Sequence, residues 1–266
     1  LHRLQVLMSL GRYSQVVEAC TRAQVLLDRV LPSWSEFFRT TLRLEGAYCA
    51  VYLDPRPEAA DRLLESLESV DLPGTMRFIA RSVRGELELT RGRVRTAALV
   101  QRVSLRYAGH WRSILGSGSQ WELYILSMCL VTDVELSPDD AVELDAGAIR
   151  ARAAFLLHDI LSDPAPLQRD IPTIMAFAAA VGLSVVAAED AGSDRRSVGA
   201  ELITTALAVG TNQTCRLLSH SYLRTRTEQL DARALVQAGE RIRSLDRAQL
   251  VAHAAGLARR LAGETG

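Results

Sequence analysis

Apolar and polar positions along this chain alternate with the period of an α-helix. Apolar side chains recur three and four residues apart through Leu4, Leu7 and Leu10, and again from Val16 to Leu31. The same spacing returns in later segments, so one amphipathic stretch follows another. This pattern predicts an all-α fold in which helices bury their apolar faces on one another.

A short spacing predicts the turns between these helices. In Met8 to Val16, Leu89 to Ala97 and Leu207 to Cys215, a glycine stands three residues after an apolar residue and five before a small or apolar one, and Asp54 replaces the glycine in a fourth segment. A glycine at this place permits the left-handed backbone that ends many helices. Turns near residues 11, 54 and 92 therefore predict consecutive antiparallel helix pairs, which stack into a right-handed α-α superhelix.

Prolines and glycines divide the chain into two predicted domains. The first covers residues 1–161 and includes an irregular aromatic loop near 108–120, and the second, 162–266, follows a hinge rich in proline. Beyond the first repeats we expect helices near 76–90, 94–107, 121–130, 137–161, 173–189, 195–208, 214–228, 231–243 and 247–262. Ser137 is the expected N-cap of its helix.

The basic residues are all arginine, and the chain has no lysine. Phosphate loops of the Walker type, Schiff-base enzymes and kinase-like folds all need a lysine amine, so these classes are excluded. The formal net charge is zero, which argues against direct nucleic-acid binding or an anionic membrane as partner. Residues 171–188 carry no charge and reach the lower length limit of a membrane span, but their richness in alanine favours a buried helix.

Charge is uneven along the chain. Nine arginines and only two acids occur between Arg77 and Arg112, whereas Asp133 to Asp145 holds six acids and no arginine. These are either solvated helix faces that neutralise one another or an arginine-lined surface for an acidic partner.

An aromatic set surrounds the predicted loop and is a possible ligand-binding site. It comprises Tyr107, His110, Trp111, Trp121 and Tyr124. These rings either cover a groove and stack on a ligand or seal the core where the loop crosses it.

Catalytic and metal-binding patterns are absent from the sequence. The histidines form no close pair or H-E-x-x-H motif, and the four cysteines are scattered without C-x-x-C. We therefore expect no catalytic residue, no metal and no cofactor, with buried thiols in a reducing, cytoplasmic location.

Three segments resemble the helix turn of tetratricopeptide repeats: Gly11 to Ala19, Asp54 to Ala60 and Arg91 to Ala98. They depart from it in lacking the early tryptophan and in having intervals longer than the usual ~34 residues. The arginine- and alanine-rich background is similar to the repeat or sensor regions of large actinobacterial ATP-dependent regulators of the LuxR and antibiotic-regulatory types. The chain begins at Leu1 instead of Met, which fits a piece of a longer protein.

This resemblance implies a noncatalytic protein-interaction or sensor domain of a bacterial signalling or transcriptional regulator. Its partner would be a protein or peptide segment, or a neighbouring module of the same chain. Residues near the turns would face that partner, namely Gln5, Arg12, Tyr48, Arg84 and Arg93. The alternatives are a helical domain that binds a small molecule and, as a weaker one, an all-α enzyme.

Overall fold

The fold is known from a computed structural model that describes most of the chain. The described residues are Leu4, Leu7, 12–30, 35–53, 58–68, 74–108, 118–136, 145–163, 171–211 and 216–263. Helices account for nearly all of them and no strand occurs among them, so the predicted all-α class is confirmed. Contacts divide the chain into two compact units, Leu1–Tyr107 and Ala108–Gly266.

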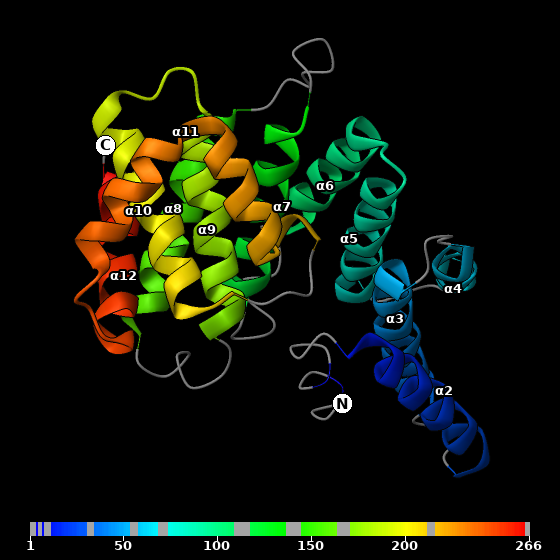
Figure 1. Ribbon diagram of the computed structural model, residues 1–266. Helices are drawn as coiled ribbons and strands as arrows, with labels where there is room; N and C mark the ends of the chain where they lie inside the picture. Colours follow the sequence, from blue (N-terminus) through cyan, green and yellow to red (C-terminus); the bar gives the residue numbers. More distant parts are fainter. Residues whose placement is uncertain are drawn as a thin grey trace. The chain divides into compact units, whose positions relative to one another are not determined.

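Unit 1 is a series of helices in which α3 has the most neighbours (Figure 1). Its helices are α2 (Tyr13–Val30), α3 (Ser35–Leu53), α4 (Glu58–Glu68), α5 (Gly74–Thr90) and α6 (Val94–Ala108). Helix α3 packs on α2, α4 and α5, and α4 also contacts α5. Two apolar clusters result, one between α2 and α3 and the other among α3, α4 and α5.

The predicted turn at Gly92 is confirmed. Helix α5 ends at Thr90 and α6 begins at Val94, while Gly92 adopts a positive φ of 73°. The amide of Arg93 donates to the Glu88 carbonyl at 2.9 Å, which closes the α5 terminus in the manner of a Schellman motif. The predicted turns at residues 11 and 54 lie outside the described residues.

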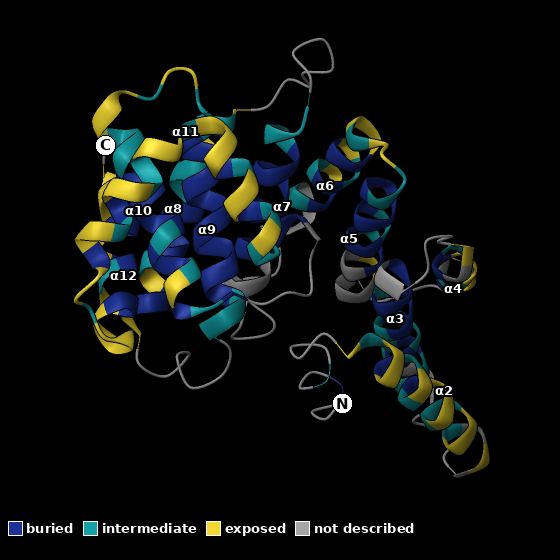
Figure 2. Ribbon diagram, viewed as in Figure 1, coloured by how far each residue is buried: buried dark blue, intermediate teal, exposed yellow. Residues whose placement is uncertain are grey.

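Unit 2 is a bundle built around a central buried helix. It contains α7 (Gly118–Val134), α8 (Ala146–Ser162), α9 (Ile171–Ala187), α10 (Ser193–Val209), the short 3₁₀ helix η4 (Arg216–Leu218), α11 (His220–Ile242) and α12 (Arg247–Gly263). Helix α9 packs on α7, α8, α10 and α11, and every residue from Ile174 to Val186 is buried (Figure 2). The prediction of a buried helix here is confirmed, and no helix in the described parts of the chain has the length and hydropathy needed to cross a bilayer.

Contacts in unit 2 reach well beyond sequence neighbours. Helix α8 packs on α12, and α10 packs on both α11 and α12. In a solenoid each repeat contacts only the adjacent ones, so these contacts do not confirm a superhelix here. The unit boundary after Tyr107 also differs from the expected division at 161/162, because α8 packs on helices that follow the predicted hinge.

Helices α9 and α10 approach most closely where two glycines meet. A Cβ added to Gly182 would lie 2.5 Å from the Gly199 carbonyl oxygen, and one added to Gly199 would lie 2.8 Å from the Gly182 carbonyl oxygen. The backbones are therefore in direct contact at this crossing.

Several helix boundaries differ from the sequence prediction, whereas the expected break at residue 231 is present. Ser137 lies outside the described residues, and α8 begins at Ala146, where the Asp145 carboxylate accepts from the Ala148 amide at 2.8 Å. The helices expected at 214–228 and 231–243 are joined as α11, but Asp231 breaks the helical geometry with φ −158° and ψ 80°. Its carboxylate caps the second half by accepting from the Ala234 amide at 2.9 Å.

Candidate functional site

A polar cleft in unit 2 lies between the end of α7 and the first turns of α11. Its volume is about 420 Å³, within the range typical of small-molecule sites. Every lining residue carries a polar side chain: Glu135, Ser219, Ser221, Tyr222, Thr225, Arg226 and Gln229. Most of the lining surface is polar, in contrast to the predominantly apolar sites of most drug-like ligands.

Glu135 connects the two walls of the cleft. Its Oε1 accepts a hydrogen bond from the Tyr222 hydroxyl at 2.7 Å. Arg226 Nε lies 3.0 Å from the same oxygen, an ion-pair contact that lacks hydrogen-bond alignment. Arg226 also donates to the Val134 carbonyl at 3.1 Å and to Gln229 Oε1 at 3.2 Å, so it holds the end of α7 against α11.

The Tyr222 phenol is held in its neutral form. Burial raises its pKa above the ordinary value, and the hydrogen bond to Glu135 and the charge of that carboxylate raise it further. The hydroxyl consequently stays protonated, and able to donate to Glu135, even at a pH where an ordinary phenol ionises.

Sequence patterns alone do not reveal this cleft. His220 to Arg226 is a polar stretch without a recognisable functional motif, and nothing in the sequence links it to Glu135, which lies 87 residues from Tyr222. The one indication of this contact in the sequence is charge: the acids that follow Asp133 are complementary to the arginines of α11.

The predicted aromatic set is described in part. Tyr124 is buried in α7, and its ring is tilted by 56° to that of Phe177 with centroids 5.9 Å apart. This residue packs in the core, as the sealing alternative expects. His110 and Trp111 lie outside the described residues, and only the helical backbone of Tyr107 and Trp121 is described, so their ligand role stays a prediction.

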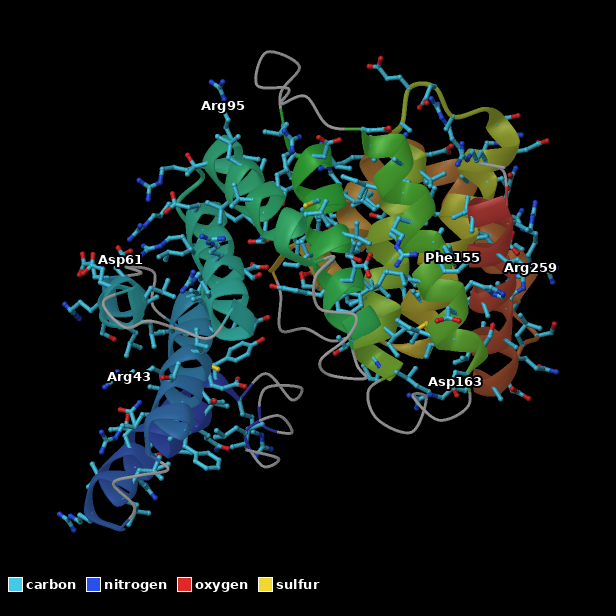
Figure 3. All side chains as sticks on the ribbon, turned by 180° about the vertical axis from the view of Figure 1, so that it is seen from behind. Arg43, Asp61, Arg95, Phe155, Asp163 and Arg259 are labelled. Carbon is cyan, nitrogen blue, oxygen red and sulfur yellow. The ribbon has the colours of Figure 1, made fainter. Side chains whose placement is uncertain are left out.

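Two of the predicted partner-facing arginines take part in an ion-pair network within unit 1. Asp61 on α4 (Figure 3) accepts from Arg84 at 2.5 Å and from Arg91. Glu88 pairs with Arg93, whose Nε lies 2.5 Å from Oε2, and with Arg91 at 3.6 Å. The guanidinium of Arg91 lowers the pKa of Asp61, chiefly by its hydrogen bond. These contacts support mutual neutralisation of the arginine-rich segment.

The other predicted partner-facing residues have different environments. Arg12 is exposed immediately before α2. Tyr48 is half-buried and packs on both apolar clusters of unit 1, which gives it a structural role between them. Gln5 lies outside the described residues.

A second polar cluster, missed in the sequence, joins three helices of unit 2. The buried Glu201 of α10 accepts from Arg241 of α11 and lies 2.7 Å from Nε2 of His253 on α12. Arg241 also donates to Ser197 at 3.1 Å. A carboxylate shared by a guanidinium and an imidazole is well suited to tying these helices together.

Outside these two polar clusters, His158 and three cysteines pack against other parts of the chain. His158 Nδ1 lies 3.1 Å from the Ala255 carbonyl oxygen, across the contact of α8 with α12. Cys20, Cys49 and Cys129 are buried thiols that form no disulfide bond, and burial raises the pKa of Cys20 to about 11. No group of metal-ligating side chains assembles among the described residues.

Comparison with protein families, curated proteins and solved structures finds no match to this chain.

Proposed function

We propose that the chain is a noncatalytic interaction domain in which stacked helix pairs of unit 1 form a superhelical surface for a protein or peptide segment. What supports this is the order of packing in unit 1, where α3 lies on α2, α4 and α5 and the Gly92 turn joins α5 to α6. Stacked pairs of this kind leave extended helix faces open to a partner.

The outer face of α6 is a part of unit 1 that is suited to contact that partner. Leu99 and Val103 are 45% and 40% exposed although both are large apolar residues. They lie four residues apart, so they form one stripe on the helix. Arg93 stands at the start of this helix with its side chain 52% exposed. A partner with apolar side chains and a nearby acid complements this face.

In this proposal the apolar side chains supply binding affinity and the charged side chain supplies specificity. Burying Leu99 and Val103 supplies affinity at about 25 cal/mol per Å² of apolar surface. The half-exposed Arg93 adds only ~0–1 kcal/mol per ion pair, so it contributes orientation and specificity. Both Arg84 and Arg93 are ion-paired within unit 1. Arg84 is excluded from this surface because its side chain, paired with Asp61, is only 22% exposed, whereas Arg93 keeps half of its side chain exposed beside Glu88.

The cellular setting follows from the resemblance of the repeats. We place the chain in a larger cytoplasmic bacterial regulator, where the partner is a neighbouring module or a separate protein. With zero net charge, the chain is not expected to contact nucleic acid itself.

Site-specific photo-crosslinking in the full chain tests this proposal. A benzophenone side chain at Leu99 should yield a discrete adduct in cells, whereas the same group at Val236, which is 68% exposed on α11, should not give that adduct. The double change Leu99→Ser and Val103→Ser should then abolish co-purification of the captured protein. Identical adducts from both positions, or unchanged co-purification, would contradict an interaction through α6.

A second candidate function, a small-molecule sensor, is favoured by the cleft of unit 2. Its volume of about 420 Å³ and its preformed hydrogen bonds suit a small polar ligand.

A further inference from the structure

The chemistry of the cleft in unit 2 restricts what it could hold. One acid and one base line it, Glu135 and Arg226, and they contact each other at 3.0 Å. A bound anion would meet the Glu135 carboxylate, and a bound cation would meet the Arg226 guanidinium. A neutral ligand avoids both repulsions.

Hydrogen-bonding capacity remains on the cleft side chains after their internal contacts are counted. Both contacts of Glu135 fall on Oε1, which leaves the lone pairs of Oε2 as acceptors. Gln229 uses its Oε1 to accept from Arg226, so its amide NH₂ retains two donors. The exposed Thr225 hydroxyl supplies a donor and acceptors. The exposed Ser221 hydroxyl lies 3.4 Å from Ser219 Oγ, where either group can be the donor, and it retains an acceptor lone pair.

The cleft is also held in place before any ligand arrives. Tyr222 is fixed at both ends, because its hydroxyl donates to Glu135 and its amide donates to Ser219 Oγ at 3.4 Å. Arg226 joins the end of α7 to the same helix through the Val134 carbonyl. Rigid polar groups lose little entropy on binding, which favours affinity for a small polar molecule.

We propose that this cleft binds a small neutral polyhydroxylated molecule, such as a sugar or another polyol. Neighbouring hydroxyls of such a ligand each donate one hydrogen bond and accept others. They therefore match the mixed array formed by the Glu135 carboxylate, the Gln229 amide and the Ser221 and Thr225 hydroxyls. This site is independent of the α6 surface and belongs to the other unit.

Binding is tested with the full chain and a defined panel of probes. The neutral probes are glucose, trehalose and myo-inositol, and the charged analogues are glucose 6-phosphate and glucosamine. Saturation-transfer NMR detects contact and titration calorimetry gives the dissociation constant. We expect at least one neutral probe to bind, and the charged analogues of glucose to bind no more tightly than glucose itself.

A pair of double variants locates the binding. Ser221→Ala with Gln229→Ala removes two ligand-facing groups and should weaken binding about tenfold or more. The matched control is Gln237→Ala with Ser244→Ala, which changes the same residue types at exposed positions outside the cleft lining and should leave binding unchanged. Circular dichroism verifies that both variants are folded.

Three results would overturn the inference. The first is that no neutral probe binds to the folded chain. The second is that the Ser221→Ala, Gln229→Ala variant binds as tightly as the unchanged chain. The third is that a charged analogue binds more tightly than its neutral parent. Crosslinking through Leu99 is unaffected by any of these results, so failure of the polyol site and failure of the interaction proposal are distinguishable.

Discussion

Substitution of Gly182 by alanine places one methyl group where α9 and α10 are in backbone contact. The new Cβ would lie 2.5 Å from the Gly199 carbonyl oxygen and 2.8 Å from Cγ1 of Ile203. Real Cβ atoms essentially never come within 3.0 Å of another heavy atom, so the helices must separate by about 0.5 Å. Rotation of a side chain cannot relieve this clash, because the nearest atom belongs to the backbone.

The expected loss of stability follows from two opposing terms. Overpacking a well-filled core costs ~1–3 kcal/mol, and a backbone obstacle in the buried centre of α9 places Gly182→Ala at the upper end. Alanine gains about 1 kcal/mol over glycine in a helix interior. We therefore expect the free energy of unfolding of unit 2 to fall by ~2 kcal/mol.

Gly256 provides a matched control in α12. It is exposed within the helix, and a Cβ added there meets no atom within 4 Å. Gly256→Ala should therefore raise stability by about 1 kcal/mol through helix propensity alone. The two Gly→Ala substitutions should therefore change the free energy of unfolding in opposite directions.

Urea unfolding followed by circular dichroism measures this difference for the whole chain. Hydrogen exchange of α9 and α10 peptides assigns it to unit 2, since amides in this core should exchange faster in the Gly182→Ala variant. The reasoning is refuted if Gly182→Ala stabilises the protein as Gly256→Ala does, because the helices would then have room for a methyl group at their crossing.

Three further predictions concern ionisable groups. The pKa of Asp61 is lower in the folded than in the unfolded chain, so its pairing with Arg91 stabilises unit 1 above the unfolded pKa of about 3.9, and this stabilisation is lost as the pH falls through the folded value. Asp61→Asn should therefore lower the melting temperature at neutral pH and make it depend less on acid. A melting temperature with the same acid dependence as that of the unchanged chain would contradict this. The thiols of Cys20 and Cys49 are buried with raised pKa values, so Ellman's reagent should label them only after unfolding, and rapid labelling of the native chain would refute their inertness. The pKa of Tyr222 lies above its ordinary value of 10.0, so Tyr222→Phe should not change the number of tyrosines that ionise near that pH by ultraviolet titration, whereas loss of one would show that the phenol titrates normally.

Local features of this fold were predictable because their causes lie within a few residues. The Gly92 turn follows from one glycine between two amphipathic segments, and the connection before α12 follows from Asp246, whose carboxylate accepts from the Gln249 amide at 2.8 Å. The uncharged stretch that became α9 was likewise predictable as a buried helix.

Long-range pairing was not predictable, because many partners are chemically equivalent in the sequence. Any of several acids satisfies an arginine, so the choice of Asp61 by Arg84 and Arg91 depends on how α4 and α5 pack. The hydrogen bond from Tyr222 to Glu135, which joins the two walls of the cleft, likewise depends on how α7 and α11 pack. Charge composition left mutual neutralisation and an acidic partner as alternatives, and it could not indicate which residues pair.

The interruption of α11 at Asp231 has a consequence for how this chain can change in length. One residue inserted into a continuous helix turns everything after it by about 100° and moves its buried face to the outside. At Asp231 the helical geometry is already broken and the second half starts from its own cap. An extra residue at this joint can therefore be absorbed locally, leaving Tyr222 in the cleft and Arg241 against Glu201. The joint is the natural place for insertions and deletions to accumulate in this helix.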